Sequence, residues 1–353
     1  MANCHELFHQ YNQKIKLSDE KRAVLITVRE SLRRRMNLNF KSIPTLERRN
    51  LGLDFQTQGS FVMDTIIRPL NDDYDLDDGV YFHDGISKSE RPIPKVFHNW
   101  VLRSVNTDNE YEKVTDKPTC VRVRYKQGFH IDLPIYYADD YDSPDLAHTQ
   151  KGWILSNPIE FIAWFEDKTQ SGFEKRFINE ALKYAEPFER WLTDIRKQDC
   201  QLRRLVRYMK AWADLKRSEM PAGIIMTILV ANNYAINDRD DVTLRNTLIN
   251  IRRYLLSNGI KCPRPTTPSG EDLFATTSEA EKKYFMNALD GFINSANTAI
   301  ETINEQVARQ EWGKHLGNRF LSNGTQSYPT KNDPNLDALK RTAVISTPWS
   351  PKG

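Results

Sequence analysis

The feature that most constrains the fold of this chain is a pair of acids, Asp75 and Asp77, directly downstream of a Gln-Gly-Ser turn at residues 58–60. Side chains alternate along a strand, so both acids would project from one face while Leu76 points into the core. Two carboxylates on one face can bind magnesium. A surface strand with ordinary acids has the same pattern, but the phosphate-sized turn beside it favours metal-dependent nucleotidyl transfer.

Length and charge narrow the class of protein. A chain of 353 residues exceeds the usual single domain and favours two lobes with a cleft. Its 50 basic and 47 acidic residues nearly balance, which argues against constitutive nucleic-acid binding but allows local basic clefts. The longest apolar run, residues 224–231, is far shorter than a bilayer span, and the N-terminus has no signal pattern. We therefore expect a cytoplasmic protein without a membrane partner.

The first half of the chain is rich in strand patterns. Ser18 is placed to cap an amphipathic helix that runs to Met36. Residues 53–58 read as a strand, 60–68 as a short helix stopped near a proline, and 119–125 and 129–137 as two further strands. The last strand carries one acid, Asp132, among apolar residues. A buried acid needs a partner, and both a salt bridge and a metal ion fit that need.

After a helix start at residues 156–158, the pattern becomes mostly helical. The strongest helix spans 201–216. Along it, Arg203, Arg207 and Lys210 follow at intervals of four and three residues, so they form a row on one side. This basic row could face phosphates across a cleft or form a solvated surface.

Four segments in this order, 58–60, 75–81, 129–134 and 205–212, resemble the cGAS/DncV-like nucleotidyltransferase family, the bacterial CD-NTases. The resemblance implies an α+β fold, with a polymerase-β-like nucleotidyltransferase core joined to a helical second lobe. In this scheme residues 1–155 form the core, whose N-terminal helix packs across both lobes, residues 156–317 form the helical lobe, and residues 318–353 form a flexible C-terminal tail.

The resemblance also implies an activity and its residues. The expected activity is synthesis of a cyclic di- or trinucleotide second messenger from ATP, GTP or other nucleoside triphosphates, in antiphage defence. Two Mg²⁺ ions, with Mn²⁺ as a substitute, would be the cofactors. By position, the metal-binding and catalytic carboxylates are Asp75, Asp77 and Asp132, and the nucleotide-binding residues are Gln58, Gly59, Ser60, Lys210 and Asp272.

Some family members act beside ubiquitin-like conjugation enzymes, and the resemblance extends that expectation to Gly353 at the end of the tail. Glycine's steric freedom permits such a conjugation without requiring it. Two other functions fit the same fold. One is a nucleotidyltransferase that makes linear oligonucleotides or modifies RNA, and the other is an inactive nucleotide-binding module.

Overall fold

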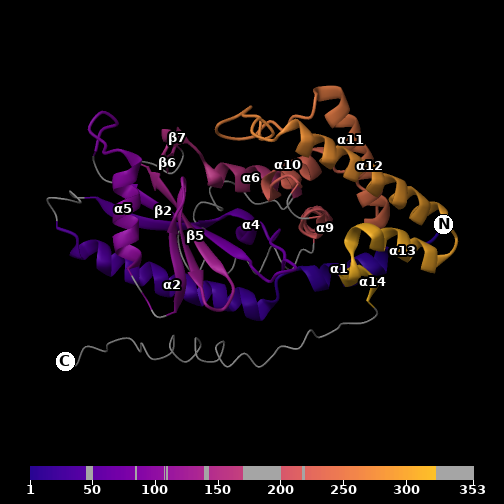
Figure 1. The fold of residues 1–353 in the computed structure, drawn as a ribbon, viewed down its shortest axis with the longest axis horizontal. Coiled ribbons are helices and arrows are strands. Elements are labelled where there is room, and N and C mark those ends of the chain that lie inside the picture. Colours follow the sequence, from indigo (N-terminus) through magenta and orange to yellow (C-terminus); the bar gives the residue numbers. More distant parts are fainter. Residues whose placement is uncertain are drawn as a thin grey trace.

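The computed structural model describes residues 1–44, 51–83, 86–106, 108, 110–138, 143–169, 200–216 and 219–322. Figure 1 shows two halves: one contains all the labelled strands, and the other is built of helices. Among the described residues, none of the helices has the length and apolar character needed to cross a bilayer.

A seven-stranded sheet forms the first half, with the order β1-β2-β5-β4-β3 and with β6 joining β5 to β7. The predicted strands are confirmed. Among the strands of the described residues, β2 and β5 pair in parallel and the other pairs are antiparallel. The strands are β1 (Gly52–Gln58), β2 (Asp75–His83), β3 (Tyr111–Asp116), β4 (Cys120–Tyr125), β5 (His130–Tyr137), β6 (Asp145–His148) and β7 (Gly152–Leu155).

The register of this sheet brings the predicted acids together. Asp77 lies opposite Asp132 across the parallel pair β2 and β5, and opposite Gln58 across the antiparallel pair β1 and β2. Leu76 is fully buried between the two acids of β2, as the alternation predicts. Three segments that are far apart in sequence therefore meet at one end of β2.

Helices α2 (Asp19–Ser42) and α5 (Pro94–Val105) pack against the sheet (Figure 1). The Ser18 side chain accepts a hydrogen bond from the Lys21 N–H, so the predicted N-cap is confirmed, although the helix continues past the predicted end. The helix predicted over residues 60–68 is wrong in length. Helix α4 (Gly59–Val62) is a single turn, and the chain leaves it at Asp64, which adopts the left-handed conformation with φ 51°.

The other half packs helices around a shared core. They are α1 (His5–Ile15), α6 (Pro158–Thr169), α9 (Gln201–Lys216), α10 (Gly223–Asn233), α11 (Asp240–Asn258), α12 (Glu279–Glu301), α13 (Glu305–Leu316) and α14 (Asn318–Leu321). The start of the chain belongs to this half, since the centroid of the Phe8 ring lies 4.9 Å from that of the Trp312 ring and 5.0 Å from that of the Phe320 ring. The predicted tail is corrected at its start, because Phe320 is buried in α14. Residues 323–353, including Gly353, lie outside the described part.

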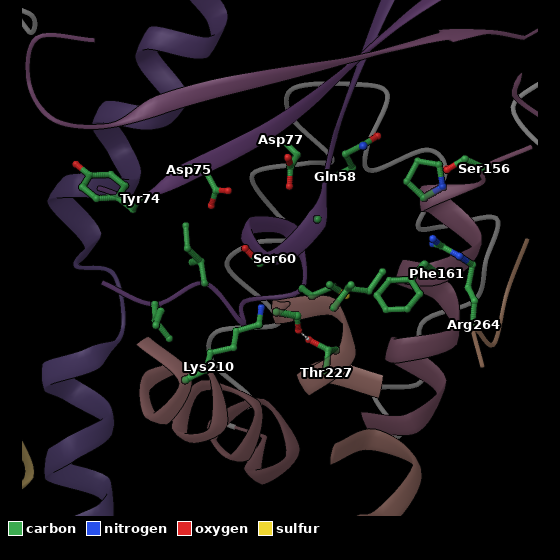
Figure 2. Close-up of a pocket in the computed structure, with 18 of the residues that line it drawn as sticks. Gln58, Ser60, Tyr74, Asp75, Asp77, Ser156, Phe161, Lys210, Thr227 and Arg264 are labelled. Atoms are coloured by element: carbon green, nitrogen blue, oxygen red, sulfur yellow. Dashed lines mark hydrogen bonds between the residues drawn. The ribbon is translucent and has the colours of Figure 1, made fainter. Parts of the chain in front are cut away.

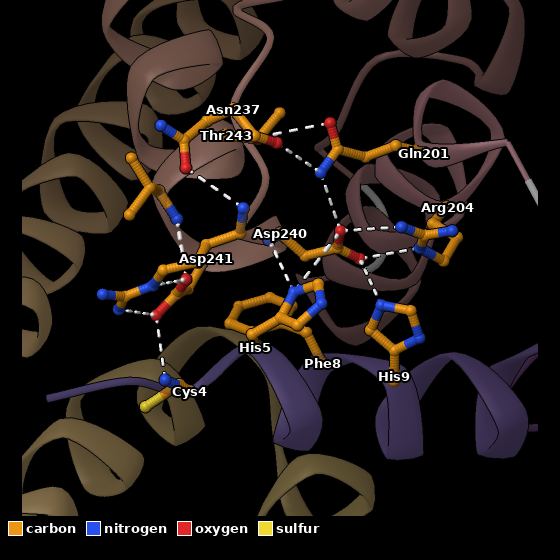
Figure 3. A network of polar contacts seen from close by, with 12 residues as sticks. Cys4, His5, Phe8, His9, Gln201, Arg204, Asn237, Asp240, Asp241 and Thr243 are labelled. Carbon is orange, nitrogen blue, oxygen red and sulfur yellow. Dashed lines mark hydrogen bonds and ion pairs between the residues drawn. The ribbon is translucent and has the colours of Figure 1, made fainter.

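A polar network ties the N-terminus to the helical half (Figure 3). The Cys4 N–H donates to the Asp241 carboxylate at 2.9 Å, and the Asp240 N–H donates to His5 Nδ1 at 3.0 Å. Both Asp240 oxygens accept from Arg204 of α9, at 2.8 and 2.9 Å. His5, His9 and Asp240 have a spacing that could hold a metal ion, but each oxygen of this carboxylate already accepts two hydrogen bonds, one from Arg204 and one from Gln201 or Tyr208. We read the network as a structural clamp.

Candidate active site

A cavity of about 480 Å³ lies between the end of β2 and the helices α6, α9 and α10. Six of the eight predicted site residues line it: Gln58, Gly59, Ser60, Asp75, Asp77 and Lys210. Figure 2 shows the two acids pointing into the cavity from the sheet, Lys210 opposite them, and Ser60 between. The two halves of the protein thus contribute opposite charges to one cavity.

The acids form a site that suits divalent cations. Carboxylate oxygens of Asp75 and Asp132 and a ring nitrogen of His130 lie within 4.8 Å of one another. Burial raises the pKa of Asp77 well above its usual value, and the negative charges of Asp75 and Asp132 raise it further. Carboxylates that oppose one another's ionisation in this way are the donors that Mg²⁺ prefers. The residues present therefore fit a metal site.

Asp132 has a second partner. Arg122, directly opposite it on β4, donates to both of its oxygens, at 2.7 and 2.6 Å. Of the two partners that the sequence left open, the salt bridge is present, and Asp75 and His130 lie close enough to Asp132 to bind a cation with it. Asp132 is buried and does not itself line the cavity. A metal ion bound by Asp132 would share that carboxylate with Arg122.

The turn between β1 and α4 needs glycine for two reasons. Gly59 has φ 72°, in the left-handed region that other residues rarely adopt. A Cβ atom at this position would lie 2.2 Å from Asp77 Oδ2, so the turn and the acid approach as closely as they do only because the side chain is missing. Before the turn, Gln58 Nε2 donates to the Tyr136 hydroxyl at 3.1 Å.

Tyr136 lines the cavity and was missed in the sequence. It lies four residues after Asp132 on β5, so strand alternation places both side chains on one face. Its ring stacks on that of Tyr81, with the ring centroids 4.7 Å apart. The spacing from Asp132 was the signal that could have found it.

Of the predicted basic row, only Lys210 reaches the cavity. Its Nζ donates to the carbonyl and the hydroxyl of Thr65, at 3.2 Å each. Burial lowers the pKa of Lys210 to about 8, against the opposing effect of Asp75 and Asp77. Both interpretations of the row, facing phosphates and forming a solvated surface, are wrong for Arg203 and Arg207, because both are buried and bound to protein acceptors.

Asp272 does not line the cavity. Its Oδ1 accepts from the N–H groups of Cys262 and Phe274, at 2.9 and 3.0 Å, and so organises the loop between them. The same loop carries Arg264, which does line the cavity and was missed. Arg264 Nε donates to the Glu271 carboxylate at 2.8 Å, which fixes the direction of the guanidinium. The predicted loop thus reaches the site through a different residue.

Comparison with known proteins relates this geometry to a family. The profile of the family described as "Cyclic GMP-AMP synthase DncV-like, nucleotidyltransferase domain" matches residues 53–136, the segment from β1 to β5 that contains the turn and all three predicted metal ligands. This segment of the chain is similar to the nucleotidyltransferase domain of the cGAS/DncV-like family. The cavity lies between the matched segment and the helices that follow it.

Curated relatives extend the match beyond that domain. The chain is 24% identical to a cyclic GMP-AMP synthase of Escherichia coli over 331 residues, which covers 82% of this chain and 75% of that enzyme. It is also 24% identical to a c-di-GMP synthase of Roseivirga ehrenbergii over 309 residues, with 82% and 76% covered.

Among solved structures, the cyclic AMP-GMP synthase DncV of Vibrio cholerae superposes with a TM-score of 0.70 at 21% identity, over 91% of this chain and 98% of that chain. This likeness shows that the cGAS/DncV-like fold, a polymerase-β-like nucleotidyltransferase, extends through both halves of the chain.

Proposed function

We propose that this chain synthesises a cyclic di- or trinucleotide from nucleoside triphosphates. One observation carries the proposal: an acid pair, a glycine turn and a half-buried lysine converge on one cavity of about 480 Å³, within the range of small-molecule sites. Relatives support it, since they include cyclic GMP-AMP and c-di-GMP synthases. A crystal structure of Vibrio cholerae DncV holds the linear intermediate pppA(3′,5′)pG, which illustrates the first half of such a reaction.

The residues of the cavity would have two roles, metal binding and phosphate binding. Asp75, Asp77 and Asp132 would hold two Mg²⁺ ions, or Mn²⁺ in their place, and bound ions of this kind stabilise charge on the entering and leaving oxygens of a phosphoryl transfer. Lys210 would place a positive charge beside the triphosphate. Ser60 would donate its hydroxyl to a phosphate oxygen, where Gly59 lets the backbone approach closely.

In each transfer, a ribose hydroxyl oxygen bonds to the α-phosphorus, the bond between the α-phosphorus and its bridging oxygen breaks, and pyrophosphate leaves. The hydroxyl proton passes to a carboxylate and then to solvent. We assign this role to Asp77, because it points into the cavity, whereas both oxygens of Asp132 already accept from Arg122. A second transfer within the linear product closes the ring.

Several expectations stay predictions. A cytoplasmic site of action, a role in antiphage defence and conjugation of Gly353 by ubiquitin-like enzymes rest on the family resemblance. Deletion of Gly353 tests the last of these: conjugation by a matched ligase system would stop, and unchanged conjugation would refute it.

Magnesium-dependent release of pyrophosphate tests whether the cavity is catalytic. The double variant Asp75→Asn with Asp77→Asn should lose this release by at least about a thousandfold, since it removes two of the three proposed metal ligands. Asp290→Asn is a matched control, because that acid lies on α12 in an exposed pair with Arg252. Retained release in the double variant would refute the assignment and favour another site.

A further inference from the structure

Three basic residues of α9 bind three successive carbonyl groups. Arg203 Nη1 donates to the Met63 carbonyl at 2.6 Å, and Lys210 Nζ donates to that of Thr65 at 3.2 Å. Between them, Arg207 Nη1 donates to the Asp64 carbonyl. We call this set of contacts the carbonyl ladder. Because residues at intervals of four and three share one helix face, one side of α9 holds the whole segment 63–65.

The held segment leads directly back to the nucleotide-binding turn. The N–H groups of Thr65 and Ile66 donate to the Ser60 carbonyl, at 2.9 and 3.1 Å. Any displacement of residues 63–65 relative to α9 is therefore passed on to Ser60. The ladder fixes the spacing between the turn and Lys210, the two parts of the cavity that we assign to phosphate.

The two arginines are locked in place by acids. Arg203 forms a bidentate pair with Glu166 of α6, at 2.9 and 2.6 Å, and both side chains are fully buried. Arg207 Nη1 also pairs with the Asp64 carboxylate at 3.2 Å, and its Nε donates to Asn12 at 2.8 Å. Buried, charge-assisted contacts of this kind hold one geometry strongly. Either arginine would have to give up these contacts in order to turn toward a nucleotide.

Asp64 is the centre of the ladder. Its left-handed backbone, φ 51°, is costly for a residue with a side chain and persists only where surrounding contacts impose it. Its carboxylate contacts Arg22 of α2 as well as Arg207 of α9. One residue just after the turn is thus bound by both halves of the protein.

We propose that Arg203 and Arg207 are positioning residues for the nucleotide: through the carbonyl ladder they hold the turn at the distance from Lys210 that a triphosphate requires. The inference rests on the proposed function only in that a nucleoside triphosphate occupies the cavity. It gives the two arginines a role in substrate affinity although neither touches substrate.

The test measures the Kd of fluorescent ATP and GTP analogues in Ca²⁺, together with kcat/KM in Mg²⁺, on the full chain. Arg207→Ala should raise Kd at least tenfold, and Arg207→Lys should recover part of the loss because it keeps one donor near the Asp64 carbonyl. Arg252→Ala is the control, since it removes an arginine from a pair that is 43% and 42% exposed. Circular dichroism and urea unfolding establish which variants are folded.

A merely structural arginine would lower the urea midpoint and leave the Kd of the folded protein unchanged, and that result would overturn the proposal. If Arg207→Ala does not fold, Arg207→Lys and Asp64→Gly decide instead; Asp64→Gly keeps the left-handed backbone and removes the carboxylate. Wild-type Kd and kcat/KM in both would also overturn it. If the wild type binds nucleotide but releases no pyrophosphate, the proposed function fails, while a raised Kd in Arg207→Ala still supports the ladder. A wild type that binds no nucleotide refutes both.

Discussion

Replacing Asp77 with asparagine should stabilise the metal-free protein while removing its activity. In the absence of metal, Asp77 is a partly buried carboxylate whose pKa is raised by burial and by the charges of Asp75 and Asp132. Its ionised form is therefore under repulsion at neutral pH. Asparagine keeps the shape of the side chain and removes the charge.

The size of the gain follows from the spacing of the acids. Asp77 lies directly opposite Asp132 on the neighbouring strand, and neighbouring strands of a sheet are about 5 Å apart. Two unit charges about 5 Å apart repel by about 1 kcal/mol in water and about 3 kcal/mol at an effective dielectric constant of about 20. We expect Asp77→Asn to raise the free energy of unfolding by about 1–3 kcal/mol in EDTA.

The raised pKa of Asp77 determines how the stability of the wild type changes with pH. Since the folded protein holds the Asp77 proton more tightly than the unfolded chain does, the wild type loses stability as pH rises from the ordinary value of 3.8 through the folded-state pKa. The gain from asparagine should therefore be complete above that pKa. Urea unfolding in EDTA at several pH values measures it.

Asp78 supplies a control at the neighbouring position. It is fully buried, accepts from Arg33 Nε at 2.7 Å and from the Thr57 hydroxyl at 2.9 Å, and points to the opposite face of β2 from Asp77. Asp78→Asn should therefore lose about 1–3 kcal/mol, because the partly buried Arg33 loses its charge-assisted contact and keeps only a more distant acid, Glu30 at 3.7 Å. Added Mg²⁺ should raise the urea midpoint of the wild type more than that of Asp77→Asn. An Asp77→Asn variant less stable than the wild type in EDTA would refute the reasoning.

Three further predictions concern single side chains. Gly59→Ala should lower kcat/KM at least about a hundredfold and destabilise the fold by about 1–2 kcal/mol, because the backbone is left-handed and the new Cβ would lie 2.2 Å from the Asp77 carboxylate. Steady-state kinetics and urea unfolding measure the two effects, and a variant with wild-type kinetics would contradict the prediction. Lys210→Met should raise the KM for triphosphate more than tenfold with little loss of stability, since methionine replaces the buried stem without the charge; an unchanged KM would remove Lys210 from the site. Burial and the charge of Lys216 lower the pKa of His315 to about 4, so the free energy of unfolding of the wild type should fall by about 3 kcal/mol as pH falls from 6.5 to 4. His315→Gln should flatten this pH dependence in urea unfolding. An equally steep loss in the variant would exclude His315 as its source.

The parts of the site that could be predicted from sequence are those set by local rules. Strand alternation placed Asp75 and Asp77 on one face and buried Leu76 between them. A glycine followed by serine marked the turn. Family resemblance then connected these residues to Asp132 and Lys210, which spacing alone could not place near them.

The failures come from tertiary contacts. Arg203 and Arg207 have the same spacing as a phosphate-binding row, but their partners, Glu166 and Asp64, lie 37 and 143 residues away. Helix α4 stops after one turn because Asp64 is held in a left-handed conformation from two sides. Such partners cannot be inferred from a helix pattern.

The same limit applies to the ends of the helical half. The start of α1 and the end of α14 meet around Phe8 and Phe320, more than 300 residues apart in the sequence. Composition suggested a tail from Asn318, and only packing shows that the first residues of that segment are part of the core.

The identity of the product tests the central claim most directly. Purified protein would be incubated with Mg²⁺ and each pair of labelled nucleoside triphosphates, treated with phosphatase, and the surviving species measured by mass. We predict a phosphatase-resistant product with the mass of a cyclic di- or trinucleotide, absent with the Asp75→Asn and Asp77→Asn double variant. A product that loses its 5′-triphosphate to phosphatase would be linear. That result would identify a linear oligonucleotide synthase and contradict the claim.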